Sequence, residues 1–229
     1  MEMNTDINEA RRLIAGADAL LISASNGLSI AEGYHIFADN DMFRRQFGDY
    51  RERFGVRNVI EGASYPYPSA ADRKEFFRRL CQYWVDDYVP SEVMLNLKRL
   101  AEGKDYFVVT SNGDLHLEKA GFAEQRVFEV EGTFRDEFAP DEQVLMRKNE
   151  LFRRFIEKYQ GSPLVVLELG IGSRNRLIKL PLMQFVAQHP NVRYITLNMP
   201  GEMNVPTEIQ QQSVALAGDI AVTLRELAV

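Results

Sequence analysis

Cysteine is nearly absent from this chain of 229 residues, which contains only Cys81. A single cysteine excludes a disulfide within the chain and any zinc site built on two or more cysteines. Cys81 stands among the apolar positions of a predicted helix, so we expect a buried structural thiol and not a nucleophile. The chain also lacks an apolar run of the ~18–20 residues that a spanning helix needs, and its acidic start does not resemble a signal peptide. These absences predict a soluble, cytoplasmic protein without a membrane partner.

Positive charge is in short supply as well. The 27 Lys and Arg residues are outnumbered by 33 Asp and Glu residues, which gives a formal net charge of -6. Nucleic-acid binding needs clustered positive potential, so this balance argues against a nucleic-acid partner. Two basic pairs, Arg44–Arg45 and Arg78–Arg79, are flanked by apolar residues at helical spacing, which favours solvated helix faces.

Apolar runs of strand length alternate with helical patterns along the chain. The predicted strands are residues 19–24, 106–110, 126–130, 164–169, 193–197 and 213–216. The predicted helices are an N-terminal one capped by Asp6 and Glu9 and ended by Gly16, then 70–89, 141–159, 182–188 and one from Asp219. Strands that alternate with helices indicate right-handed crossovers. We therefore expect an α/β fold, a Rossmann-like doubly wound parallel sheet.

Aromatic residues are concentrated in one part of the sequence. Met42, Phe43, Phe47, Tyr50 and Phe54 recur at intervals of three and four residues, the spacing of one helix face. Such a stripe is more often core than a cofactor site. We expect a single domain over residues 1–229 with a helical insertion at about 38–90.

Small and polar residues follow three of the predicted strands. The three loops are residues 23–27, 112–114 and 170–173. Ligands of doubly wound sheets bind beyond the carboxyl ends of the strands, and small residues let backbone N–H groups approach a phosphate. Any one such loop is weak support, but the three together predict a nucleotide site. Neither the Gly-x-Gly-x-x-Gly fingerprint nor a P-loop lysine is present.

The residues of these loops resemble the sirtuin family. Residues 110–116 (TSNGDLH), followed by Ala120-Gly121 and residues 127–132 (VFEVEG), are similar to the sirtuin run TQNIDGLH…AG…VIELHG. Residues 24–34 (ASNGLSIAEGY) resemble GAGSGMSAASGY of the sirtuins encoded beside macrodomains, called class M. Residues 167–172 (LELGIG), residues 194–198 (YITLN) and the final Gly218-Asp219-Ile220 are similar to the same branch.

The resemblance implies an NAD-binding fold. Sirtuins cleave the nicotinamide–ribose bond and pass ADP-ribose to an acyl-lysine carbonyl or, in class M, to a protein side chain. The implied catalytic residues are Asn112, Asp114 and Glu131. The implied cofactor-binding residues are Ala24, Ser25, Asn26, Gly27, Ser29 and Tyr34 for the pyrophosphate and ribose side, and Gly170, Gly172, Ser173, Asn198 and Ile220 for the adenosine half.

The chain departs from the family pattern in three ways. The four zinc cysteines are missing, and only about ten residues separate Glu131 from the next predicted helix, so we expect no zinc lobe and no metal site. Glu131 stands where the family has its catalytic histidine and class M has glutamine. Ser23, Ala24 and Ser25 replace the Gly-Ala-Gly that opens the phosphate loop, which adds Cβ atoms where backbone meets phosphate.

Glu131 decides between the possible functions. A carboxylate beside the ribose stabilises an oxocarbenium-like transition state, as in glycosidases, which suits ADP-ribosyl transfer or NAD hydrolysis. The alternative is a catalytically inactive module that binds NAD or ADP-ribose as a sensor or scaffold. A zinc-free deacylase is the least favoured function. His116 is expected to be a packing or surface histidine in a short helix.

Overall fold

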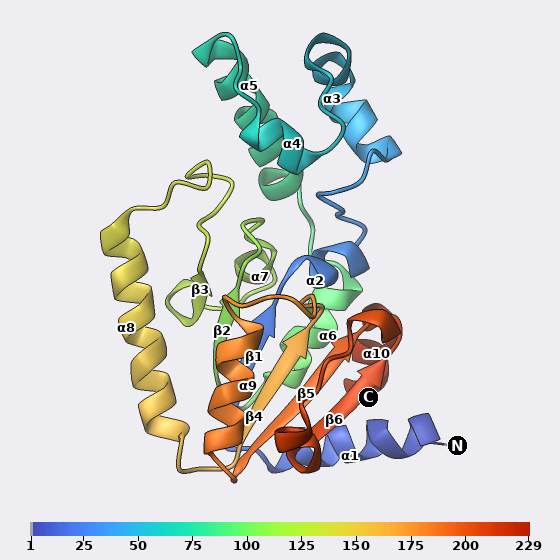
Figure 1. The fold of residues 1–229 in the computed structure, drawn as a ribbon, viewed down its shortest axis with the longest axis vertical. Helices are drawn as coiled ribbons and strands as arrows, with labels where there is room; N and C mark the ends of the chain where they lie inside the picture. The colour runs from blue at the N-terminus through green and yellow to red at the C-terminus, as the bar shows by residue number, and fades with distance from the viewer. Residues whose placement is uncertain (1) are drawn as a thin grey trace.

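A computed structural model describes residues 2–229, and its centre is one parallel sheet (Figure 1). The strands within the described residues are β1 (Ala19–Ala24), β2 (Asp105–Thr110), β3 (Val127–Glu129), β4 (Leu164–Leu169), β5 (Val192–Asn198) and β6 (Ser213–Ala217). Their order in the sheet is β3-β2-β1-β4-β5-β6, with every neighbouring pair parallel. The chain therefore winds outward in both directions from β1 and β4, which confirms the predicted doubly wound, Rossmann-like sheet.

Helices cover both faces of this sheet and also stand above its carboxyl edge (Figure 1). They are α1 (Glu2–Gly16), α2 (Asn26–Ala31), α3 (Asp41–Phe54), α4 (Val59–Ser64), α5 (Ala70–Cys81), α6 (Glu92–Leu100), α7 (His116–Lys119), α8 (Glu142–Tyr159), α9 (Lys179–Gln188) and α10 (Ile220–Leu227). None of them, over residues 2–229, is long and apolar enough to cross a membrane.

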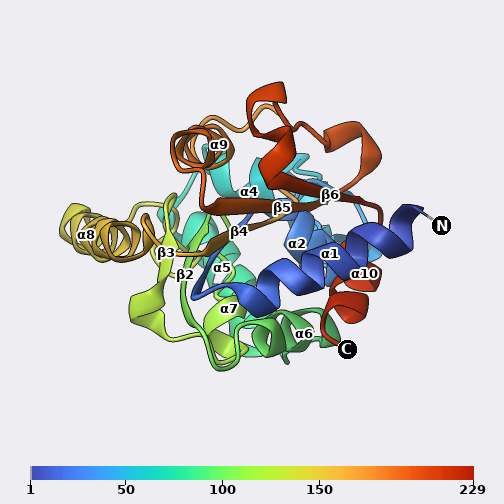
Figure 2. The ribbon, with the colours of Figure 1, turned by 90° about the horizontal axis from the view of Figure 1, so that it is seen from below.

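Alternation along the strands divides the main core into two clusters. Leu20 and Ile22 of β1 pack toward α1, α6 and α10, whereas Leu21 packs on the opposite face with residues of α8 and α9. Figure 2 shows α1, α6 and α10 on one side of the sheet and α9 on the other. Buried apolar side chains on both faces are what a central parallel strand requires.

A third apolar cluster belongs to α3, α4 and α5, which stand above the carboxyl edge of the sheet (Figure 1). Phe43, Phe47 and Tyr50 of α3 are buried against Phe76 of α5. Asn40 accepts a hydrogen bond from the Phe43 N–H and so caps α3. The predicted aromatic stripe is thus confirmed as core.

Several predicted boundaries were wrong. α1 begins at Glu2, so Asp6 lies inside the helix and does not cap it, although the helix does end at Gly16. The first small-residue loop is one residue long, because Asn26 already starts α2 directly after Ser25. The helix expected over 70–89 ends as an α-helix at Cys81 and continues as one π-helical turn, Gln82–Asp86. Helix α6 was not predicted.

Candidate nucleotide site

The site forms where the sheet reverses its strand order, beyond the carboxyl ends of β1, β2 and β4. Two glycines bring the loops after β1 and β4 into backbone contact, since the Gly27 N–H donates to the Gly170 carbonyl at 3.1 Å. A Cβ on Gly27 would lie 2.5 Å from the Gly170 Cα, and Gly170 has a φ of +62°. Both positions therefore require glycine.

A cavity of about 560 Å³ opens at this edge. It brings together five of the predicted site residues, namely Asn26, Ser29, Asn112, Asp114 and Glu131. Its other lining residues are Ile36, Phe37, Ile60, Ala63, Ser64, Ser111, Gly113, Phe134, Glu137 and Phe138. The floor is polar and comes from the strand ends, and the roof is largely apolar and includes residues of α4.

Asn112 is held rigidly on the cavity floor. Its side-chain amide donates to the Ser25 carbonyl at 3.1 Å, and its own N–H donates to Thr110 Oγ1 at 3.0 Å. The Ser111 hydroxyl donates to Ser25 Oγ at 2.8 Å and ties the same two loops together. Asn112 Oδ1 is buried and has no hydrogen-bond partner among the described residues. A buried acceptor without a partner is free to bind a ligand donor.

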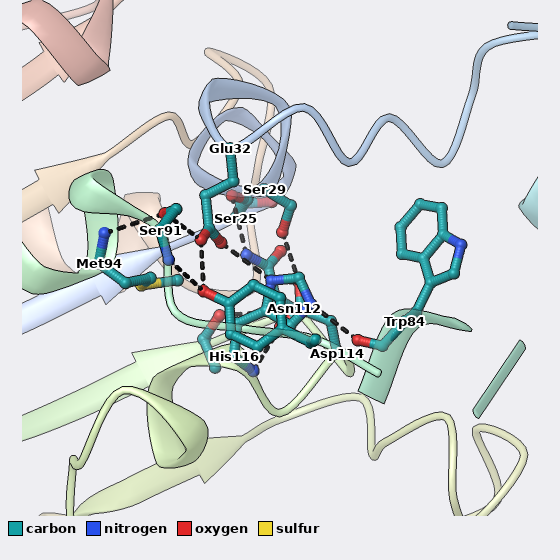
Figure 3. Close-up of polar contacts among 11 residues, drawn as sticks. Ser25, Ser29, Glu32, Trp84, Ser91, Met94, Asn112, Asp114 and His116 are labelled. Carbon is teal, nitrogen blue, oxygen red and sulfur yellow. Dashed lines mark hydrogen bonds and ion pairs between the residues drawn. The ribbon is translucent and has the colours of Figure 1, made fainter. Parts of the chain in front are cut away.

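Asp114 is the buried carboxylate of the site. Ser29 Oγ donates to Asp114 Oδ2 at 2.6 Å, and the His116 N–H donates to Oδ1 at 3.1 Å (Figure 3). Leu115, which lies between Asp114 and His116 in the sequence, has a left-handed φ of 59°. Such a conformation is unfavourable for a residue with a Cβ. The surrounding contacts must therefore fix the turn that aims Asp114.

His116 lies behind the cavity and is entirely buried, not on the surface (Figure 3). Its Nδ1 is 2.9 Å from Glu32 Oε2 and its Nε2 is 2.8 Å from the Trp84 carbonyl oxygen. Tyr34, predicted to touch the cofactor, does not line the cavity and packs edge-on against the His116 ring with centroids 4.6 Å apart. Sequence reasoning missed Glu32 completely.

Glu131 stands on the cavity wall and is exposed to solvent. No hydrogen bond or ion pair joins its side chain to another residue of the described part of the chain. Its position follows from a close backbone contact, in which the Phe134 N–H donates to the Gly113 carbonyl at 2.8 Å. A Cβ on Gly113 would lie 2.9 Å from the Gly132 carbonyl oxygen. Gly113 therefore lets the segment that carries Glu131 approach Asn112 and Asp114.

The apolar roof of the cavity was not predicted from the sequence. Phe134 and Phe138 turn into it from the segment after β3, where Glu137 and Phe138 have φ values of 54° and 60°. Arg73 of α5 forms an ion pair of 3.1 Å with Glu137 and joins this segment to the helical insertion. The glycine at position 132 was the sequence signal for a tight turn after β3, and the structure gives it a φ of +79°.

The residues assigned to the adenosine half lie on the neighbouring loops and do not line the cavity. The Ser173 N–H donates to Glu202 Oε2 at 2.7 Å, and Asn198 Nδ2 donates to the Ile171 carbonyl at 2.8 Å. The Ser173 backbone bond holds the pKa of the Glu202 carboxyl below its usual range. The Ile220 side chain is buried in the main core.

A buried ion pair supports the loop after β4. Lys179 Nζ and Glu168 Oε2 are 3.0 Å apart with both side chains fully buried. Glu168 Oε1 accepts from the Ile171 N–H at 2.8 Å, and Lys179 Nζ donates to the Ile171 carbonyl at 3.1 Å. These bonds fix the backbone between Gly170 and Gly172. No cluster of three potential metal ligands occurs within residues 2–229.

Comparisons with known proteins support this fold. No model of a known protein family matches the chain. A protein ADP-ribosyltransferase of Staphylococcus aureus (strain Mu50) is 23% identical over an alignment of 265 residues, which covers 92% of this chain and 83% of the relative. A Sir2 homologue in complex with NAD has 18% identity and a TM-score of 0.60, with 96% of this chain and 92% of that chain covered. A mutant Sir2 homologue in complex with ADP-ribose has 18% identity and a TM-score of 0.61, with 96% and 94% covered.

Proposed function

Because the chain is sirtuin-like and has the fold of the Sir2 homologues, we propose that it is an NAD-dependent ADP-ribosyltransferase that modifies a protein side chain. The observation that carries the proposal is the meeting of Asn112, Asp114 and Glu131 at one cavity. The Staphylococcus aureus relative, named a protein ADP-ribosyltransferase, supports the same chemistry.

The polar floor fits the nicotinamide riboside end of NAD. Asn112 Oδ1, buried and unpartnered, matches the donors of a carboxamide or a ribose hydroxyl. Asp114 offers a carboxylate to ribose hydroxyls, and Asn26 and Ser29 line the same wall. The pyrophosphate and adenosine would follow the loops of Ala24–Gly27, Gly170–Ser173 and Asn198, which adjoin along the sheet edge.

Negative charge on the cavity wall suits cleavage of the nicotinamide–ribose bond. Positive charge develops on the ribose as this bond breaks, and nicotinamide leaves as a neutral molecule. The Glu131 carboxylate, free of any cationic partner among the described residues, would stabilise that charge, with Asp114 supporting it from the floor. Both side chains would act by electrostatics and hydrogen bonding to the sugar.

The acceptor would enter beneath the apolar roof. Phe37 before α3, Ile60 of α4 and Phe134 of the segment after β3 leave an apolar approach to the floor. Residues 130–141, between β3 and α8, form only turns and no separate lobe. This arrangement favours transfer to a side chain over deacylation, because sirtuin zinc lobes help to shape the acyl-peptide cleft.

The direct test is incubation of the purified protein with NAD labelled in the nicotinamide or the adenylate half, with and without cell extract. We expect nicotinamide release and labelled protein bands, both lost in Glu131→Ala. Glu102→Ala removes an exposed glutamate outside the site and is the matched control. Absence of nicotinamide release with every extract would refute the proposal.

A second candidate function is a binding module without turnover. It is favoured by Ser25, whose side chain occupies a place that sirtuins leave to glycine and is held there by Ser111. Calorimetry that finds ADP-ribose binding, together with no NAD cleavage, would select this function. Loss of that binding in Asn112→Ala would locate it to the same cavity.

A further inference from the structure

His116 has a polar environment that the proposed reaction does not use. The ring is fully buried, yet both of its nitrogens lie within hydrogen-bond distance of oxygen atoms, Glu32 Oε2 at 2.9 Å and the Trp84 carbonyl at 2.8 Å. The ring also stacks on Tyr88, with centroids 3.6 Å apart and planes 7° apart. A histidine that only fills space in the core would not need hydrogen-bond partners for both ring nitrogens.

These contacts specify the protonation of the ring. A backbone carbonyl only accepts, so Nε2 must carry a proton toward Trp84. Glu32 Oε1 already accepts from the Tyr88 and Ser91 hydroxyls, each at 2.5 Å. Oε2 is then the acceptor for a proton on Nδ1. A ring that donates from both nitrogens is an imidazolium, and these contacts fit that form.

Asp114 needs a nearby cation. It is buried, and its hydrogen bonds come from the Ser29 hydroxyl and the His116 N–H. Among residues 2–229, no Lys or Arg forms an ion pair with Asp114 or Glu32. The His116 Nδ1 atom lies 3.8 Å from Asp114 Oδ2 and is the cation that both carboxylates share. Burying a carboxylate without such a partner raises its pKa.

We propose that His116 is a positioning residue for Asp114, an imidazolium held by Glu32 that keeps the Asp114 carboxylate ionised and aimed at the ribose. The role of Asp114 toward the ribose rests on the proposed function, whereas the charge state of His116 does not. Two carboxylates around one cation leave a single negative charge at the floor, which complements the positive charge that develops on the sugar.

The groups around His116 agree with this charge state. Burial by itself lowers the pKa of His116, but Asp114, Glu32 and the Trp84 carbonyl together raise it above the ordinary value. The other titratable groups that face the ring are Tyr34 and Tyr88, and burial raises the pKa of both, so they stay neutral. No second cation competes for the carboxylates in the described part of the chain.

The first test reads the charge of His116 directly. Nitrogen-15 NMR of histidine-labelled protein distinguishes imidazolium from neutral imidazole, and only three histidines are present. We expect the signal that His116→Gln removes to be that of an imidazolium at neutral pH, because its surroundings raise the pKa of His116 above the ordinary value. A neutral His116 ring below pH 7 would overturn the proposal, whether or not the protein turns over NAD.

The second test reads the effect on Asp114. In His116→Gln the acid limb of the pH profile of nicotinamide release should move to higher pH, with kcat lowered more than the NAD affinity. The double variant His116→Gln/Glu32→Gln removes one positive and one negative charge, so it should recover part of the shift. His189→Gln is the matched control. A merely structural role for His116 predicts a double variant no better than the single one.

Failure of folding is checked by circular dichroism and thermal melting of each variant. If His116→Gln does not fold, Glu32→Gln alone tests the same point, because loss of its carboxylate should lower the pH at which the His116 ring becomes neutral in the NMR titration. An unchanged imidazolium signal in that variant would contradict the assignment of Glu32. Wild-type protein without NAD turnover would refute the proposed function and leave the NMR result standing.

Discussion

Gly27 and Gly170 are in backbone contact across the point where the sheet reverses direction. Their N–H···O distance is 3.1 Å, and a Cβ on Gly170 would lie 2.4 Å from the Gly27 Cα. The loops after β1 and β4 therefore form one continuous surface and not two separate turns. The cofactor would cross this joint in passing from the ribose floor to the adenosine loops.

Replacing Gly27 by alanine should disrupt this joint. The added Cβ meets backbone atoms that have no room to move, so we expect a loss of about 1–3 kcal/mol in the free energy of unfolding, seen as a lower melting temperature. ADP-ribose binding measured by calorimetry should weaken as well. Gly16→Ala, where a Cβ meets nothing within 4 Å, is the control. Equal melting temperatures and equal affinities for the two variants would contradict the prediction.

Neutralising Glu131 should separate binding from catalysis. In Glu131→Gln we expect nicotinamide release to slow by about 10²-fold, the order found when one electrostatic contact to a transition state is removed. ADP-ribose affinity should stay the same or increase, because the substitution removes a negative charge from the wall of a cavity that would bind an anionic ligand. Glu102→Gln serves as control. A Glu131→Gln variant with the wild-type rate would show that charge at this position does not contribute.

Removing the Phe37 side chain should affect the acceptor and not the cofactor. Phe37 lines the cavity while about half of its surface is exposed, so Phe37→Ala should leave the melting temperature unchanged. We expect protein labelling to fall about tenfold, equivalent to ~1.4 kcal/mol of lost contact, while NAD hydrolysis in the absence of acceptor continues. Val89→Ala, exposed and outside the cavity, is the control. Equal losses of labelling and hydrolysis would argue against an acceptor site under the roof.

A buried acidic pair should make stability depend on pH. Burial and the neighbouring Glu129 raise the pKa of Glu118 to about 9, against an ordinary value of 4.5, although Lys148 lowers it. Between about pH 4.5 and 9, Glu118 therefore keeps a proton in the folded protein that it has lost in the unfolded chain. The free energy of unfolding consequently falls as the pH rises through this window.

Glu118→Gln reproduces the protonated form and removes that dependence. We expect its melting temperature to exceed that of the wild type by an amount that grows from pH 5 to pH 9, measured by thermal melting across this range. Glu102→Gln should follow the wild-type curve. Parallel curves for Glu118→Gln and the wild type would show that Glu118 is ionised in the folded protein.

The sequence predicted the floor of the site better than its surroundings. Residues at the carboxyl ends of adjacent parallel strands must lie together, so the strand pattern alone placed Asn26 near Asn112 and Asp114. The contact of Glu32 with His116 was not predictable in this way, because 84 residues separate them and the contact depends on how the chain returns through Trp84 and Tyr88.

The roof escaped prediction for a different reason. Phe134 and Phe138 belong to a segment with neither helical nor strand periodicity, and left-handed backbone at Glu137 and Phe138 directs them into the cavity. The residue types of Glu137 and Phe138 do not predict a left-handed conformation. The error at Asp6 was local, since a capping pattern within a longer helix looks the same as one at its start.

The apolar roof of the cavity packs with the cluster of α3, α4, α5 and Phe134, which is separate from the two clusters on the faces of the sheet. Substitutions that reshape the roof therefore change the packing of side chains that do not stabilise the sheet. Selection can change the acceptor of such a protein while leaving its handling of the nucleotide intact. Under the proposed function, the same separation would make α3–α5 the segment to exchange in order to alter the choice of target.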